Sequence, residues 1–449
     1  MNDELKALHD NQTWSVVPLP KGHKVVGARW IYKTKFHSDG TIERHKARLV
    51  ARGFTQIFGV DYKETFAHVA KMNIVRVLLS VVVNSGWNLF QMDVKKMLFC
   101  MVTWRKMWFK RSHGNSSMFV RNGKMGRLIV LVYVDDLIII GDSDSEIQAL
   151  KKSLHSTFAI KDLGRLRYFL GIEMDQTPGQ LFLNQRKYIS DFLHEVGMQD
   201  TKIAHSPLPS NLNLDTESES LPDIAHYQRL VGKLIYLTIT RPDITHAVRL
   251  VSQFMHSPHS YHLQLVKRIL RYLKGSMTKG IFMKKHSHFK HEGYTDLDWA
   301  GNVLDRKFTT GFCTFVGGNL VTWKSKKQSV VARSSAEAEY RAMALAACEL
   351  IWLKTLLSDL GIIVSTPIIL HCDNQAAMHI AANPVFHKKT KHIEVDCHFI
   401  RNQVQSKLLS TAYIKSSEQL ADVFTKILPT TQFGHLLFKL GSRDSLDLV

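Results

Sequence analysis

The sequence predicts an α+β amino-terminal part followed by a mixed α/β domain of about 150 residues. Hairpin patterns in the first third of the chain support the first assignment, and the order β-β-β-α-β-α-α-β-α after residue 290 supports the second. A length of 449 residues fits roughly three domains. The contents of 45% hydrophobic and 22% charged residues are ordinary for globular proteins and exclude a disordered or collagen-like chain.

The first element expected is a β-hairpin over residues 28–54, with its turn at Ser38, Asp39 and Gly40. Basic side chains alternate with apolar ones along both arms, so one face can pack while the other presents cations. Nine Lys and Arg residues occur in and around this hairpin: Lys21, Lys24, Arg29, Lys33, Lys35, Arg44, Lys46, Arg48 and Arg52. Two interpretations remain open, a solvated hairpin face and a surface for polyanions.

A second hairpin is expected over residues 128–141, where two short apolar arms meet at Asp135 and Asp136. Adjacent carboxylates at the tip of a buried hairpin repel each other and lose hydration, and a bound Mg²⁺ relieves both costs. A solvent-exposed turn is the alternative, because Asp is a common turn residue, but the strongly apolar arms favour the metal site. Asp93 ends another apolar run, although a helix cap explains a single Asp equally well.

Residues 206–223 are rich in Ser, Pro, Asn and acidic side chains and predict a loop or linker. Residues 262–275 predict an amphipathic helix that ends in Gly275. Its apolar positions are Leu263, Val266, Leu270 and Leu273. Between Asp243 and Glu292 there is no acidic residue but nine Lys and Arg, and this absence of acids favours a phosphate-facing surface.

After residue 290 the expected elements are a strand, a hairpin, a long helix, a strand, two helices, a strand and a last helix. In chain order they are residues 291–302, 309–327, 334–361, 367–374, 375–383, 389–404, 408–414 and 417–428. Ser334 and Glu337 have the spacing of a capping box at the start of the long helix, and Gly361 follows its end.

Four acidic residues of this region lie on separate predicted elements. Asp296 lies in the first strand and shares a face with Asp298, Asp373 ends the strand at 367–374, and Asp422 lies in the last predicted helix. Glu339 falls on the apolar stripe of the long helix, where a carboxylate needs a partner, so it is the better catalytic candidate and Glu337 the better cap. Taken singly, each acid also fits a cap, a turn or a surface charge.

The charge balance indicates the kind of partner. The chain has 59 Lys and Arg against 39 Asp and Glu, a formal net charge of +20, which attracts nucleic acid or, less favourably, an anionic membrane surface. The five cysteines are odd in number and form no CxxC pair, so a reducing compartment is expected, the cytoplasm or the nucleus. We expect no membrane span and no signal peptide, because acids interrupt the longest apolar run.

The YVDD sequence at residues 133–136 resembles the polymerase signature of reverse transcriptases. Further segments are similar to the Pol polyprotein of copia-type LTR retrotransposons. They are residues 11–20, 28–56, 61–72, 91–96, 162–174 and 227–248 for the polymerase, and 334–342 and 370–377 for its ribonuclease H domain. The similarity extends over nearly the whole chain, so it is far more specific than a four-letter motif.

This resemblance implies a polymerase that copies an RNA template from a DNA primer. The ligands it implies for two Mg²⁺ ions are Asp93, Asp135 and Asp136. Lys46 and Arg48 are expected to face the incoming triphosphate, with a general phosphate contact as the alternative. The turn implied to grip the primer end is formed by Phe169, Leu170 and Gly171.

The polymerase departs from its family in one place. Only 42 positions separate Asp93 from Asp135, whereas family members carry considerably more chain there, so we expect an internal deletion around residues 98–118. The loss is expected to remove a supporting helix, to leave apolar palm surface uncovered, and to weaken or abolish polymerisation. Because capsid, protease and integrase segments are absent as well, a truncated element is expected.

In the ribonuclease H part, the resemblance implies that Asp296, Glu339, Asp373 and Asp422 bind two Mg²⁺ ions, with Mn²⁺ as a substitute, and cut RNA within an RNA–DNA hybrid. The domains expected are reverse transcriptase fingers and palm over 1–205, a linker and basic helical thumb or connection over 206–290, and a ribonuclease H-like domain over 291–449. The alternative is a catalytically inactive basic remnant that only binds nucleic acid. No membrane partner is expected.

Overall fold

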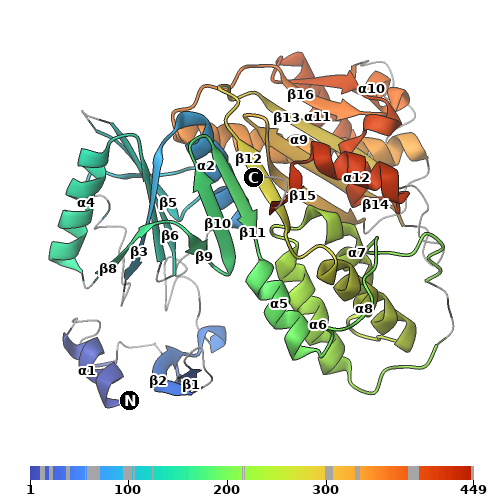
Figure 1. Ribbon diagram of the computed structural model, residues 1–449. Helices are drawn as coiled ribbons and strands as arrows, with labels where there is room; N and C mark the ends of the chain where they lie inside the picture. The colour runs from blue at the N-terminus through green and yellow to red at the C-terminus, as the bar shows by residue number, and fades with distance from the viewer. Residues whose placement is uncertain are drawn as a thin grey trace.

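The computed structural model describes most of the chain. The described residues are 1–10, 16–19, 24–36, 41–55, 57, 71–94, 104, 107–123, 126–134, 136–158, 160–214, 216, 218–298, 307–328, 334–382 and 394–445. The first of them form helix α1 (Asn2–Asp10) and the antiparallel strands β1 (Ala28–Phe36) and β2 (Ile42–Ala51), which confirms the two arms of the first predicted hairpin. Its predicted turn at Ser38, Asp39 and Gly40 lies outside the described residues. Figure 1 shows this unit apart from the main body of the molecule.

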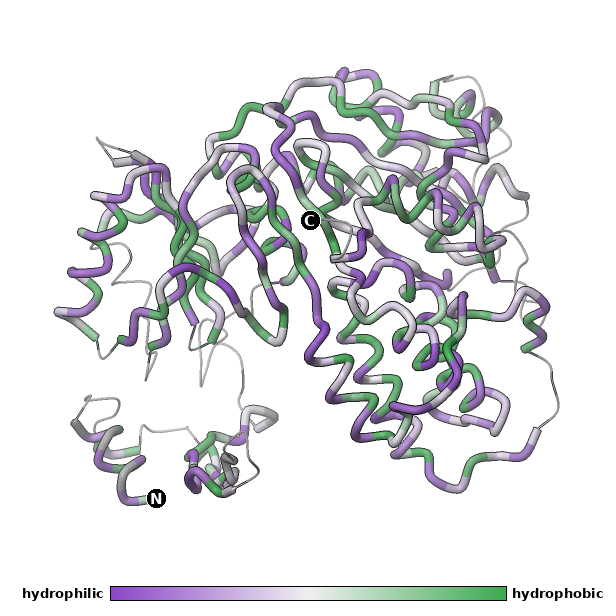
Figure 2. The backbone as a smooth tube through the Cα atoms, viewed as in Figure 1, coloured by the Kyte–Doolittle hydropathy of each residue, from purple (hydrophilic) through white to green (hydrophobic). Residues whose placement is uncertain are grey.

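A six-stranded sheet contains the second predicted hairpin. In the order β4-β5-β6-β7-β3-β8 its strands are Lys110–Arg111, Met118–Asn122, Arg127–Tyr133, Asp136–Gly141, Asn88–Val94 and Ile160–Arg165. Helix α4 (Asp144–Thr157) covers one face and α2 (Met72–Ser85) covers the other. Alternate residues of β6 therefore join two different cores, and Figure 2 shows hydrophobic residues gathered along these central strands.

The structure differs from the expectation that the shortened palm leaves apolar sheet surface uncovered. Trp104, which lies inside the shortened stretch, has only 1% of its surface exposed. Its ring stacks on Phe119 and meets Phe109 edge-on, each at 5.3 Å between ring centroids. For the described strands that part of the expectation is wrong, because residues within the shortened stretch fill the space over the sheet.

A second sheet and a group of helices follow. The sheet has the order β18-β12-β11-β10-β9, with strands Ser442–Asp444, Lys279–Lys284, Gln180–Asn184, Ile172–Thr177 and Tyr168–Phe169. Helices α5 (Arg186–Glu195), α6 (Ile224–Leu237), α7 (Thr245–Val251) and α8 (Ser260–Lys274) share one hydrophobic core. The boundary proposed at 205/206 thus falls between α5 and α6, two helices of the same core. The predicted loop at 206–223 and the amphipathic helix ending at Gly275 are confirmed for the described residues.

The last part is a mixed α/β unit, as predicted. Its sheet has the order β15-β14-β13-β16-β17, with strands Asn319–Lys327, Thr309–Val316, His291–Asp298, Ile368–Cys372 and Leu409–Tyr413. Strand β13 is antiparallel to β14 and parallel to β16, which is parallel to β17. The helices are α9 (Ser335–Asp359), α10 (Gln375–Ala382), α11 (Glu394–Gln405) and α12 (Thr430–Lys439).

The helix predicted over 417–428 is wrong. The chain forms two short 3₁₀ turns there, Ser416–Glu418 and Leu420–Phe424 (η7), and the last α-helix starts only after Pro429. The side chain of Gln419 explains the tight turn, because its Nε2 donates to the Thr295 carbonyl at 3.0 Å while its Oε1 accepts from the Ala421 N–H at 3.2 Å. These two bonds hold the chain against β13.

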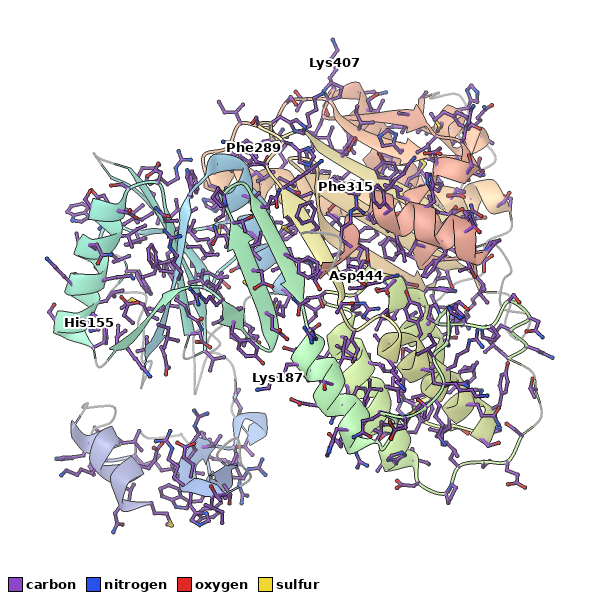
Figure 3. The ribbon with its side chains drawn as sticks, viewed as in Figure 1. His155, Lys187, Phe289, Phe315, Lys407 and Asp444 are labelled. Carbon is purple, nitrogen blue, oxygen red and sulfur yellow. The ribbon has the colours of Figure 1, made fainter. Side chains whose placement is uncertain are left out.

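Helix α2 joins the six-stranded sheet to the last unit. Its Arg76 Nε donates to the Val321 carbonyl at 2.7 Å, and its Ser80 hydroxyl donates to the Val316 carbonyl at 2.7 Å. One hydrophobic core includes α2 together with residues of β14, β15 and α9, Phe315 among them (Figure 3). None of the described helices is long and apolar enough to cross a bilayer.

Candidate active site

Four acids from four different elements come together at one end of the last sheet. Asp296 lies in β13, Glu339 near the start of α9, Asp373 directly after β16, and Asp422 in η7. Carboxylate oxygens of Asp296, Asp373 and Asp422 lie within 4.8 Å of one another, and the same limit holds for ligand atoms of Glu339, Cys372 and Asp373. The structure thus brings all four predicted residues into one cluster.

Three of the four acids are buried, and one carboxylate oxygen of the cluster has no partner among the described residues. Asp296, Asp422 and Glu339 are 1%, 3% and 6% exposed, and Glu339 Oε2 has no hydrogen-bond partner there. Burial, reinforced by the charges of Asp296 and Asp373, raises the pKa of Glu339 to about 9. Burial and the nearby Asp296 carboxylate raise the pKa of Asp422 to about 7. Carboxylates arranged in this way are stabilised by a cation.

Lys426 is a cation already in contact with the cluster. Its Nζ lies 3.0 Å from Asp296 Oδ1 and 2.7 Å from Asp422 Oδ1. The Thr425 hydroxyl donates to Asp296 Oδ2, and Ser416 donates to Asp373 Oδ2 at 3.0 Å. Sequence reasoning missed Lys426, although its position four residues after Asp422 was a usable signal.

The donor set fits a hard divalent cation. Its members are carboxylate oxygens, the ligands that Mg²⁺ prefers, and Glu339 Oε2 is a buried acceptor without a donor in the described chain. The Cys372 thiol also lies close, but burial raises its pKa far above the usual value, so it stays a neutral thiol and a poor ligand for Mg²⁺. The chemistry of the four carboxylates therefore fits a divalent cation better than that of the thiol does.

The two glutamates at the start of α9 have different surroundings. Ser334 Oγ accepts from the Glu337 N–H at 3.2 Å, so the helix begins with the predicted cap. The Glu337 carboxylate is buried as well, but it accepts from Arg341 at 3.3 Å, one turn along the helix. Among the described residues, the acids whose oxygens converge include Glu339 and not Glu337. Asp298 lies outside that group, although burial raises its pKa to about 6.

A second pair of acids lies in the six-stranded sheet. Asp93 of β3 pairs directly with Asp136 of β7, so the two residues share one face of neighbouring strands. Gln91 Nε2 donates to Asp136 Oδ1 at 3.0 Å. Because Asp93 lies inside a strand, the helix-cap interpretation is wrong. Asp135, the other acid at the hairpin tip, lies outside the described residues, and Val134 beside it has a φ of +52°.

The remaining predicted polymerase residues lie in two places. Lys46 and Arg48 lie two residues apart in β2 of the separate hairpin. Phe169, Leu170 and Gly171 form a turn between β9 and β10, with left-handed φ values of +50° at Leu170 and +71° at Gly171. The Phe169 ring meets Tyr133 edge-on at 5.7 Å, so the turn lies beside the β6–β7 hairpin.

Comparison with known proteins identifies the family. The reverse transcriptase (RNA-dependent DNA polymerase) family matches residues 11–103 and 97–210 in two pieces. The chain is 39% identical over 488 residues to the retrovirus-related Pol polyprotein from transposon RE1 of Arabidopsis thaliana, an alignment that covers 98% of this chain and 33% of that protein. The chain therefore spans a third of the length of this relative.

A further sequence match is strong, whereas a match to a solved structure is weak. An uncharacterized mitochondrial protein of Arabidopsis thaliana is 45% identical over 225 residues, covering 50% of this chain and 94% of that protein. The solved N-terminal ribonuclease H domain from Mycobacterium tuberculosis, fused to maltose-binding protein, matches 33% of this chain and 97% of that one, at 13% identity. Its TM-score of 0.21 is too low to carry a structural argument. On the sequence matches, the chain belongs to the copia-type family of retrotransposon Pol polyproteins.

Proposed function

We propose that the chain cleaves the RNA strand of RNA–DNA hybrids at the cluster of Asp296, Glu339, Asp373 and Asp422. The convergence of these four acids, three of which are buried, is the observation that carries the proposal. Two Mg²⁺ ions, or Mn²⁺ in their place, bound there would activate a water molecule and stabilise the leaving ribose oxygen. The net charge of +20 supports a polyanionic substrate.

The chain's own residues prepare this site. Lys426 neutralises part of the charge of Asp296 and Asp422, and Thr425 fixes the second oxygen of Asp296. Ser416 orients Asp373 in the same way. Glu339 Oε2 is left as an acceptor that a bound cation would satisfy. These contacts hold carboxylates from four elements in one arrangement before any substrate binds.

The test is cleavage of a labelled RNA in a hybrid with DNA, in Mg²⁺. We expect wild type to cut this hybrid and to leave the same RNA intact as a single strand or as an RNA duplex. Asp373→Asn is expected to lower the cleavage rate by more than roughly 100-fold. Changes to groups that only support a metal ligand cost up to about 100-fold, and the loss of a ligand itself is expected to cost more. If wild type cuts no faster than Asp373→Asn, the chain is instead an inactive nucleic-acid-binding remnant.

We further propose that RNA-directed DNA polymerisation is weakened or lost in this chain. The family matches in two pieces that meet near residue 100, and the alignment to the RE1 relative runs over 488 residues although this chain has 449. The break between the two pieces supports missing polymerase sequence near residue 100, and the longer alignment supports the absence of some sequence from this chain. Primer extension on an RNA template is expected to give no more product with wild type than with Asp135→Asn. Extension that depends on Asp135 would contradict this proposal.

A further inference from the structure

We propose that a groove beside the edge strand β4 binds single-stranded RNA, with an unpaired base stacked on Trp108. The groove has a volume of about 280 Å³, and its lining includes Trp108, Lys110, Arg121 and Asp359. It lies between the six-stranded sheet and the end of α9, and none of its described lining residues belongs to the four-acid cluster. This surface is therefore separate from the nuclease site, and its binding can be measured without cleavage.

Trp108 is exposed at a cost that the fold maintains. Its side chain is 85% exposed, although an aromatic ring gains more than most side chains from burial. Its φ of +64° is left-handed, a conformation that a bulky residue adopts only at a cost. Strain of this kind persists where the surrounding structure enforces it, and it is concentrated at sites that hold ligands. The exposed ring is therefore a contact point for a ligand.

The residues on both sides of Trp108 are anchored. Phe109 is 4% exposed, and its N–H donates to the Trp104 carbonyl at 2.9 Å. The guanidinium carbon of Arg121 lies 5.0 Å from the centroid of the Phe109 ring, and Arg121 NH1 donates to the Met107 carbonyl at 3.4 Å. These contacts hold the turn, so that it presents the ring of Trp108 to water.

The charge of the groove suits a phosphate backbone. Lys110 and Arg111 form β4 directly after the exposed ring, and both are exposed and line the groove. Among the described lining residues, Asp359 is the one acid. Because Arg121 pairs with Glu146 at 2.7 Å, the two residues of β4 supply the excess of positive charge. An exposed aromatic ring beside a basic groove is the combination by which proteins bind single strands.

The groups in the groove favour a single strand of RNA. The bases of a duplex are paired and stacked, whereas an unpaired base can turn out and stack on a protein ring. Asp359 at the end of α9 accepts from the Ser112 hydroxyl at 2.6 Å and from the Gly114 N–H at 2.9 Å. Both bonds, the ones recorded among the described residues, go to Oδ2, which leaves Oδ1 to accept from a ribose 2′-hydroxyl. DNA lacks this hydroxyl, so we assign RNA.

The experiment measures the affinity of four variants for a labelled oligouridine by fluorescence anisotropy, in EDTA so that no cleavage occurs. Trp108→Ala removes the ring, and its control Phe438→Ala removes another ring that is 61% exposed and lies 3.3 Å from the guanidinium carbon of Arg443. Lys110→Met removes a charge from the groove, and its control Lys407→Met removes one from an exposed position elsewhere (Figure 3). The comparison ligands are oligodeoxyuridine and a labelled polyglutamate peptide.

Trp108→Ala is expected to weaken the binding of oligouridine by between about fivefold and 150-fold, the effect of losing one stacked base, and to leave the salt dependence unchanged. Lys110→Met is expected to reduce the slope of log affinity against log salt concentration by about 0.7, the value for one phosphate contact of a single strand. Both controls are expected to bind like wild type. Trp108→Gly suits the positive φ, so it is expected to lose affinity without a lower melting temperature.

Three results would overturn the proposal. If wild type does not bind oligouridine, or if Trp108→Ala and Phe438→Ala bind it equally well, Trp108 makes no specific contact with RNA. If wild type binds oligodeoxyuridine as tightly as oligouridine, the assignment of RNA is wrong. If Lys110→Met loses the polyglutamate peptide but not the RNA, the groove is a docking site for an acidic protein. The nuclease proposal is tested separately, because Glu339→Gln is expected to bind oligouridine like wild type.

Discussion

Lys426 gives the acidic cluster a cation of its own. Its Nζ contacts Asp296 and Asp422, and their carboxylates raise its pKa above the usual value, which outweighs the opposing effect of burial. A divalent ion bound between these two acids must share their oxygens with the ammonium or displace it. The lysine and the metal are therefore expected to compete, and this competition can be measured.

Lys426→Met is expected to destabilise the metal-free protein and to strengthen its response to Mg²⁺. Removing the ammonium leaves two buried carboxylates uncompensated, at a cost of about 2 kcal/mol once the partial exposure of the lysine is allowed for. Thermal unfolding with and without Mg²⁺ measures both effects. If Mg²⁺ raises the melting temperature of the variant no more than that of wild type, the ion does not bind beside Lys426.

Two buried histidines predict how stability changes with acid. Burial lowers the pKa of His246 and of His291 to about 4, well below the usual 6.5. The unfolded chain therefore takes up protons at a higher pH than the folded chain does, and folding stability falls as the pH drops from about 6.5 towards 4. Above pH 6.5 both rings are neutral in either state, and these groups add no further pH dependence.

His291→Phe is expected to reduce this acid sensitivity. Neither ring nitrogen of His291 has a hydrogen-bond partner in the described chain, so an apolar ring loses little. One such group accounts for about 3 kcal/mol between pH 6.5 and pH 4. Urea unfolding at several pH values tests this, and parallel curves for wild type and His291→Phe would contradict the assignment.

At the scale of single elements, a buried ion pair ties the start of α7 to the end of α8. Arg241 and Asp243 have fully buried side chains, with Arg241 NH2 2.7 Å from Asp243 Oδ2. The Tyr272 hydroxyl donates to Asp243 Oδ2 at 2.8 Å, and Arg241 NH1 donates to the Ser276 carbonyl at 2.9 Å. These polar contacts between the two helices thus join groups that water does not reach.

Asp243→Asn is expected to lower the free energy of unfolding by about 3–5 kcal/mol, because it leaves the Arg241 guanidinium buried without its counter-ion. The matched control is Glu195→Gln, which breaks the exposed pair of Glu195 and Lys233 and is expected to cost less than about 1 kcal/mol. Urea unfolding monitored by circular dichroism compares them. Equal losses would show that the buried pair contributes no more than a surface pair.

Local sequence signals predicted most elements, and tertiary contacts account for the exceptions. The hairpin at 128–141, the order of strands and helices along the chain from residue 291 to α11 and β17, and the cap at Ser334 follow from alternation and capping residues, which act within a few positions. The helix predicted over 417–428 failed because Gln419 bonds to Thr295, more than a hundred residues away in sequence.

At the scale of the whole molecule, the parts are joined by more than a linker. Helix α2 donates from Arg76, Ser80 and Asn84 to backbone carbonyls of the β14–β15 hairpin. The segment between β4 and β5 also contacts α9. Ser112 donates to Asp359 at the end of α9 at 2.6 Å, and Trp352 Nε1 donates to the Gly114 carbonyl at 3.0 Å. A single hydrophobic core extends across these contacts.

The segment 291–449 alone is therefore expected not to fold into a stable unit, because the surfaces that contact α2 would face water. We expect it to aggregate when produced alone and to become soluble when produced together with residues 1–290. Circular dichroism and gel filtration measure both. A soluble, cooperatively folding monomer of 291–449 that cuts hybrids would show that the shared core is dispensable.

The most direct test of the account compares two glutamates two residues apart on α9. Glu339→Gln changes an acid of the cluster, and Glu337→Gln changes a buried acid that pairs with Arg341 instead. The initial rate of RNA cleavage in a hybrid is measured in Mg²⁺ for both variants and for wild type. We predict a loss of more than roughly 100-fold for Glu339→Gln and a rate near wild type for Glu337→Gln. Equal rates for the two variants would contradict the claim that the four converging acids are the catalytic site.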